Sequence, residues 1–83
     1  MQNGIDLSQF YQGLDALFQK KDSSETMRYL ERWLQEAENK QDSSGIVAVS
    51  NELGGLCRAM GQIDRAKNLY RTVLTNLEHM GLT

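Results

Sequence analysis

The chain has 83 residues, which is enough for one small domain and too few for a two-domain enzyme. Apolar residues make up 40% and charged residues 24%, values typical of soluble globular proteins, so a disordered or collagen-like chain is excluded. Nine Lys and Arg stand against eleven Asp and Glu, and the longest basic run is Lys20-Lys21, so the usual electrostatic footprint of nucleic-acid binding is missing.

The termini and the cysteine content bear on location. Cys57 is the single cysteine and cannot form an internal disulfide, and no Asn-x-Ser/Thr acceptor occurs, so we expect a reducing, cytoplasmic environment. Residues 1–9 lack the basic start and apolar stretch of a signal peptide, and the longest apolar run is only Ile46–Val49. We therefore expect neither a signal peptide nor a membrane span.

Two amphipathic helices are predicted in the first half of the chain. Asp6 is a favourable N-cap, and the apolar residues after it recur at spacings of three and four, which predicts a helix over residues 6–20. Asp22 and Glu25 resemble a capping-box start for a second helix over residues 23–41. The apolar stripe of this second helix consists of Met27, Leu30, Leu34 and Ala37, with Trp33 beside it.

Two further helices are predicted in the second half. The polar cluster 42–45 is a turn and N-cap signal for a helix over residues 43–60, and Gly61 offers the left-handed residue that ends it. The last helix is predicted over residues 62–80. Because proline is absent and no β-type alternation is sustained, the fold class is all-α, and the short links make consecutive helices antiparallel.

The chain also matches itself when it is shifted by 39 positions. This shift places Leu14 on Leu53, Leu17 on Leu56 and Leu30 on Leu69, and it places Arg28 and Arg32 on Lys67 and Arg71. A self-match that spans a pair of helices is typical of helical-repeat arrays. The chain is therefore predicted to form two helical hairpins, one over residues 8–41 and one over residues 47–80.

The second hairpin resembles a tetratricopeptide repeat of the variety found in kinesin-light-chain-like bacterial arrays. The resemblance lies in Leu53-Gly54, Gly61, Ala66 and Tyr70, whose mutual spacings agree with that family. Ser50 departs from it, because the family often has a large apolar residue there, and the first hairpin matches mainly at Leu14, Phe18 and Leu34. The resemblance implies a short right-handed superhelix in which Gly54 and Ala66 allow close helix packing.

Residues with reactive side chains have simpler explanations here. His79 is the single histidine, and no cluster of Cys, His and Asp has metal-ligand spacing, so we expect no metal and no cofactor. Cys57 lies on an apolar stripe, which favours a buried structural thiol over a reactive one. Tyr29 and Trp33, four residues apart, favour core or inter-repeat packing over a binding patch. Nothing supplies a nucleophile, a base and an orienting group together, so we expect no enzyme activity.

By the same resemblance, the first helix of each hairpin lines a concave groove that binds a protein or peptide partner. We expect Lys20 and Arg58 to receive an acidic segment or a C-terminal carboxylate, while Gln12 and Asn51 bond to the ligand backbone. The expected groove consists of Gln9, Gln12, Ala16, Gln19 and Lys20 with Ala48, Asn51, Gly55, Arg58 and Ala59. The expected function is a non-catalytic interaction module or scaffold.

Two hairpins are fewer than the three or so repeats that such arrays generally need. We therefore expect this chain either to be part of a longer repeat protein or to form a homodimer through its last helix. The expected stacking face consists of Leu69, Tyr70, Val73 and Leu77. The alternative is a closed four-helix bundle that serves in dimerisation or regulation; a helix-turn-helix DNA binder is disfavoured by the acidic balance.

Overall fold

The computed structural model describes residues 4–82 and contains four helices and, within this range, no strand. They are α1 (Leu7–Lys20), α2 (Ser23–Asn39), α3 (Ser43–Ala59) and α4 (Ile63–His79). The all-α prediction is confirmed, and each predicted helix boundary lies within two residues of the observed one.

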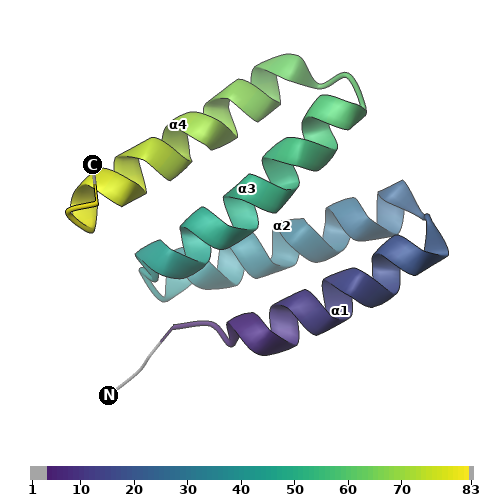
Figure 1. Cartoon of the computed structure of the whole chain (residues 1–83), viewed down its shortest axis with the longest axis horizontal. Coiled ribbons are helices and arrows are strands. Elements are labelled where there is room, and N and C mark those ends of the chain that lie inside the picture. The colour runs from purple at the N-terminus through teal and green to yellow at the C-terminus, as the bar shows by residue number, and fades with distance from the viewer. Residues whose placement is uncertain (1–3, 83) are drawn as a thin grey trace.

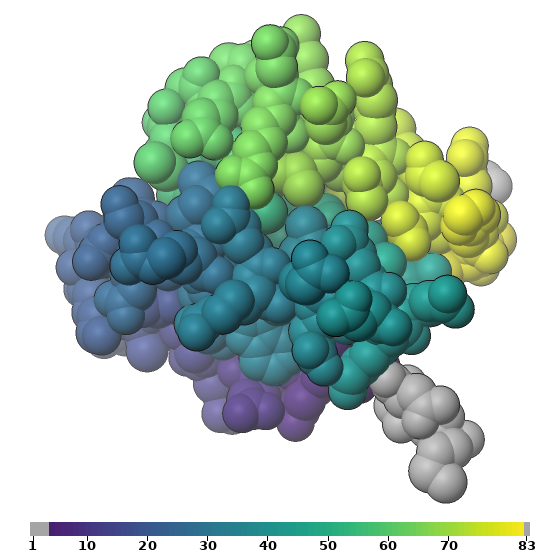
Figure 2. All heavy atoms as spheres, turned by 180° about the vertical axis from the view of Figure 1, so that it is seen from behind, coloured from purple at the N-terminus to yellow at the C-terminus, as the bar shows by residue number. Residues whose placement is uncertain are grey.

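The four helices form an open arrangement in which each packs mainly on the next (Figure 1). Consecutive helices run antiparallel, and α1 and α4 lie at opposite edges with α2 and α3 between them. The most extensive contact joins α3 to α4, followed by α2 to α3 and α1 to α2. The shortest dimension is 18 Å, close to two helix diameters of about 10 Å each, so the molecule is two helix layers thick. Seen from behind, α2 crosses the middle of the surface with α4 above it (Figure 2).

The helix starts confirm the predicted N-caps. The carboxylates of Asp6, Asp22 and Asp42 each accept a hydrogen bond of 3.1 Å from the backbone N–H three residues later. This satisfies one of the free N–H groups in the first turn of α1, α2 and α3. Gly61 adopts φ 81°, as predicted for the residue that ends α3.

The turns recur at a regular interval along the chain. Helices α2, α3 and α4 are equal in length, and their first residues, at positions 23, 43 and 63, are evenly spaced. The left-handed residues Lys21, Gln41, Gly61 and Gly81 have the same spacing. The N–H groups of residues 42, 62 and 82 donate to the carbonyls of residues 37, 57 and 77 at 2.8–2.9 Å, a bond that closes a Schellman-type helix end.

Because of this regular interval, α2 superposes on α4 with position 23 on position 63. This shift is one residue longer than the shift of 39 positions that the sequence match predicts. Apolar stripes alternate spacings of three and four, so a slip of one residue still places apolar residues on apolar residues. Turn residues allow no such slip, because the left-handed residue and the N-cap have fixed places. The repeating hairpin is also longer than the common tetratricopeptide repeat, which has about 34 residues.

The core lies between the layers and contains the closest helix approaches. The largest fully buried side chains are those of Phe10, Leu14, Leu30, Val49, Ser50, Leu53 and Cys57. A Cβ added to Gly54 would lie 2.9 Å from Cε1 of Tyr70, so α3 and α4 pack as closely as predicted. Gly13 of α1 has the same relation to Tyr29 of α2. Cys57 is a buried free thiol, as predicted.

Candidate interaction surfaces

The residues predicted to line the groove lie on α1 and α3. Gln9, Gln12, Gln19 and Lys20 are exposed on α1, and Asn51, Gly55 and Arg58 are exposed on α3. Of the three alanines predicted with them, Ala16 and Ala59 are exposed and Ala48 is half-buried. A Cβ added to Gly55 would meet no atom within 4 Å, so the surface of α3 is open at its middle. Every predicted groove side chain except that of Ala48 is thus accessible to a ligand.

The two cations of this surface differ in their surroundings. The ammonium of Lys20 lies 3.8 Å from the carboxylate of Glu25, a solvent-exposed pair worth less than about 1 kcal/mol. Arg58 forms no ion pair with any other residue in the range 4–82. Its guanidinium therefore remains available for a carboxylate ligand.

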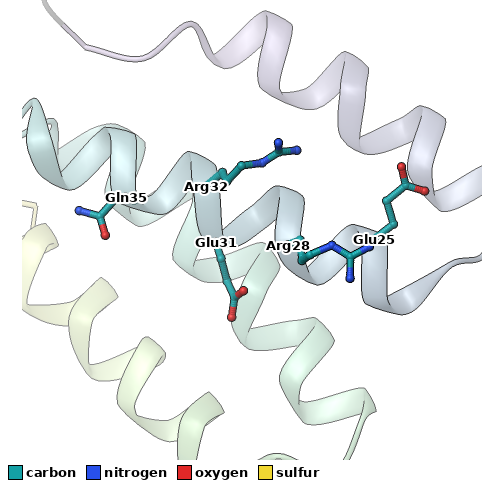
Figure 3. A pocket seen from close by; sticks show the side chains of 5 residues that line it. All are labelled: Glu25, Arg28, Glu31, Arg32 and Gln35. Carbon is teal, nitrogen blue, oxygen red and sulfur yellow. The ribbon is translucent and has the colours of Figure 1, made fainter.

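A second candidate surface lies on the outward side of α2. It has a shallow hollow of about 430 Å³, lined by Glu25, Arg28, Glu31, Arg32 and Gln35 of this single helix (Figure 3). A smaller hollow of about 150 Å³ adjoins it and is lined by Arg32, Trp33 and Glu36. The only sequence signal for a site here is that Arg28 and Arg32 are repeated basic positions in the self-match of the chain.

The carboxylates around these hollows are paired with other cations. Glu31 accepts a 2.7 Å bond from Arg65 of α4, and Glu36 lies 3.6 Å from Lys40. Arg28 and Arg32 take part in no ion pair within the described part of the chain. The outward side of α2 therefore carries two guanidinium groups, one turn apart, without neutralising partners.

The aromatic side chains of α2 serve packing, as predicted. The ring of Trp33 lies edge-on to that of Phe10 with centroids 5.5 Å apart, and Tyr29 stacks on Phe10 at 6.0 Å. The Tyr29 hydroxyl donates a 2.8 Å hydrogen bond to the carbonyl of Phe10. Burial raises the pKa of Tyr29, against smaller lowering effects from Trp33 and Arg32. These contacts hold α2 on α1 and leave only the edge of Trp33 beside the smaller hollow.

The predicted stacking face of α4 is partly used within the chain. Leu69 and Val73 are only 9% and 8% exposed, so they cannot belong to a free surface, while Tyr70 and Leu77 are half-buried. The most exposed apolar side chain of α4 is Leu74 at 57%, and Ile63 follows at 47%. An apolar stripe shows how wide the apolar face of a helix is, but not which edge of that face the neighbouring helix covers. The uncovered part of α4 therefore lies at Ile63 and Leu74, farther from α3 than the expected stacking face.

His79, the last residue of α4, is exposed. Within positions 4–82, no group of three or more His, Cys, Asp and Glu residues could hold a metal ion. None of the helices in this range is long and apolar enough to cross a membrane. A scan against protein-family models, a search of curated proteins and a search of solved structures each returned no match.

Proposed function

We propose that this protein is a non-catalytic interaction module of the tetratricopeptide type, which binds an acidic segment or C-terminus of a partner protein in the cytoplasm. The observation that carries the proposal is the open packing of two hairpins, in which consecutive helices contact each other and α1 and α4 lie at opposite edges. Such arrays present one helix of every hairpin to a ligand without any need for chemistry.

The ligand surface follows from the exposed side chains of α1 and α3. Lys20 and Arg58 supply positive charge on two different helices, and Gln12 and Asn51 supply amides that can both donate and accept hydrogen bonds. An extended peptide offers backbone groups to the amides and carboxylates to the cations. Charge-assisted bonds to a carboxylate are about twice as strong as neutral ones, so the two cations favour acidic ligands.

The alternative of a closed four-helix bundle has less support. A closed bundle brings its first and last helices together around one core. Here the contacts follow chain order, and the extents of 35 × 29 × 18 Å describe a flat body. This shape favours an interaction surface over a sealed core.

The test begins with peptides selected from a random display library on the purified protein. A selected peptide is labelled, and its affinity is measured by fluorescence anisotropy for the wild type and for two double variants. Lys20→Glu with Arg58→Glu reverses the charge of the proposed surface. Arg28→Glu with Arg32→Glu makes the same change in net charge on α2 and serves as the matched control.

We expect acidic peptides to be selected, and we expect the first variant to bind them at least tenfold more weakly. Loss of one charged hydrogen bond costs about 1.5–3 kcal/mol, which corresponds to about tenfold or more in affinity. The control should stay within about threefold of the wild type. A loss confined to the control would move the ligand to the hollow of α2, and unchanged affinity in both variants would contradict the charge-based reading altogether.

A further inference from the structure

Apart from Met60 at the end of α3, the exposed large apolar side chains of the second hairpin lie along α4 and in the turn that follows it. Ile63 and Leu74 lie about three helical turns apart on one side of α4, with exposures of 47% and 57%, and Leu82 in the following turn is 64% exposed. Isolated apolar side chains on a surface are ordinary, but a row of them along one helix side marks a contact surface.

The regular spacing of the turns shows which helix side this is. When α2 is set on α4 turn for turn, Leu74 and Leu77 of α4 correspond to Leu34 and Ala37 of α2, while the ring of Tyr70 packs on Gly54 of α3. On α2, which has a neighbour on each side, Leu30 and Ala37 are fully buried and Leu34 is half-buried.

The remaining apolar residues of the two helices account for the other side. Tyr29 and Trp33 of α2 pack on α1, and their counterparts Leu69 and Val73 of α4 are buried in the second hairpin. Leu74 thus takes the place along α4 that the half-buried Leu34 has along α2, but it is 57% exposed, so this side of α4 has room for a further helix. A helix with an apolar row is the element that fits it.

The charges on this side select the occupant. Lys67 and Glu78 lie about three turns apart along the same side of α4, one before and one after Leu74. Neither side chain takes part in an ion pair or side-chain hydrogen bond within residues 4–82. With Lys67 near one end, Glu78 near the other and Arg71 between them, two pairs of opposite charge form when a second copy lies antiparallel.

The register of such a pair is fixed by its own residues. If Lys67 of one copy lies opposite Glu78 of the other, the register of the two α4 helices is set, because both residues lie within the helix. The two-fold axis then passes between residues 72 and 73, so each Leu74 lies about 2 Å from it along the helix and the two side chains meet. Both ionic pairs and the contact between the two Leu74 side chains form in this one register.

We propose that this surface, consisting of Ile63, Lys67, Leu74, Glu78 and Leu82, pairs antiparallel with the same surface of a second copy of the chain. The surface is separate from the ligand residues of α1 and α3, so the homodimer does not depend on the function proposed above. A single helix of the length of α4 spans about 25 Å and buries less than the roughly 1,200–2,000 Å² typical of stable interfaces. The dimer is therefore weak, with a dissociation constant of about 10 µM to 1 mM.

Sedimentation velocity over a dilution series from about 1 µM to 1 mM tests the proposal. The wild type should shift from monomer to dimer across this range. Leu74→Glu should weaken association at least tenfold, while Phe18→Glu should leave it unchanged. Phe18 is the matched control because it is 50% exposed and lies on α1, away from the proposed interface.

A charge exchange distinguishes this interface from general stickiness. Lys67→Glu alone sets like charges opposite each other twice per dimer and should weaken association at least threefold. Lys67→Glu combined with Glu78→Lys restores both pairs and should return the dissociation constant to within about twofold of the wild type. Both positions are exposed, and circular dichroism checks that the helices are retained.

Three results would each overturn the proposal. A strict monomer at the highest concentration would mean that the occupant is not a second copy. Loss of association in Phe18→Glu but not in Leu74→Glu would place the interface on α1. Failure of the double charge variant to recover would refute the antiparallel register.

Discussion

The contact between Gly54 and Tyr70 provides the sharpest test of how α3 and α4 pack. Gly54 and Gly55 are neighbours in the middle of α3, and both carry the cost of glycine in a helix. They differ in surroundings: an added Cβ would lie 2.9 Å from the Tyr70 ring at position 54, while at position 55 it would meet no atom within 4 Å. The same substitution to alanine at both positions therefore separates packing from helix propensity.

The expected effects differ because only one of the two sites is crowded. Gly55→Ala gains the helix-propensity difference of about 0.8–1 kcal/mol, which raises Tm by about 4–8 °C in a domain of this size. Gly54→Ala gains the same amount but forces the Tyr70 ring to move, and overpacking of this kind costs about 1–3 kcal/mol. We expect Gly54→Ala to be less stable than Gly55→Ala by about 1–3 kcal/mol.

Urea unfolding followed by circular dichroism measures both variants, and Tyr70→Leu supplies the cycle that assigns the cause. Without the ring, Gly54→Ala should stabilise the protein about as much as Gly55→Ala does, which gives a coupling energy of at least about 1 kcal/mol. If Gly54→Ala stabilised the wild-type protein as much as Gly55→Ala, the close approach of α3 and α4 would be refuted.

The remaining predictions concern single polar groups. Ser50→Ala should stabilise the protein by about 1 kcal/mol in urea unfolding, because its hydroxyl is fully buried with no hydrogen-bond partner in the described chain. Tyr29→Phe should cost about 1 kcal/mol at pH 7 through loss of the bond to a backbone carbonyl of α1. Burial raises the pKa of Tyr29, so the unfolded chain releases this proton first as pH rises through about 10; stability should fall there, and by less in Tyr29→Phe. Asp42→Ala should cost more than Asp22→Ala, by about 1 kcal/mol in the same assay, because the Asp42 carboxylate accepts from the N–H groups of both Gly45 and Ile5.

The helices could be predicted from the sequence because each carries its own signals. Aspartates at the starts, a glycine after α3 and stripes with spacings of three and four are local features, and local features place helix boundaries well. The exposure of the groove residues also follows from the stripes, since polar positions opposite an apolar stripe face water.

The register between the hairpins could not be predicted from the apolar residues alone. Stripes tolerate a slip of one residue, whereas turns do not, but the turn sequence Asp-Ser-Ser at 22–24 and 42–44 marks only the starts of α2 and α3, and the start of α4 lacks it. The close approach of the helices within each hairpin had a signal of its own. It lay in the two Gly–Tyr pairs, Gly13 with Tyr29 and Gly54 with Tyr70, which have the same separation in sequence and are each in close contact.

The side of α4 that remains uncovered also required the structure. Leu69, Tyr70, Val73 and Leu77 form one continuous stripe in the sequence, and only the placement of α3 shows that Leu69 and Val73 are used internally. Leu74 is the most exposed apolar residue of α4. It lies away from the centre of this stripe, and the expected stacking face does not include it.

Equal helices joined by equal turns have a consequence for how the two proposed surfaces relate. The turns before α3 and α4 are closed by the same hydrogen bond, although α4 packs more extensively on α3 than α3 does on α2. Helices α1 and α3 lie in one layer and α2 and α4 in the other. A ligand on α1 and α3 and a second copy on the outer edge of α4 can then be bound together. The Lys20→Glu, Arg58→Glu variant should accordingly lose its peptide and keep its dimer, and Leu74→Glu should do the reverse.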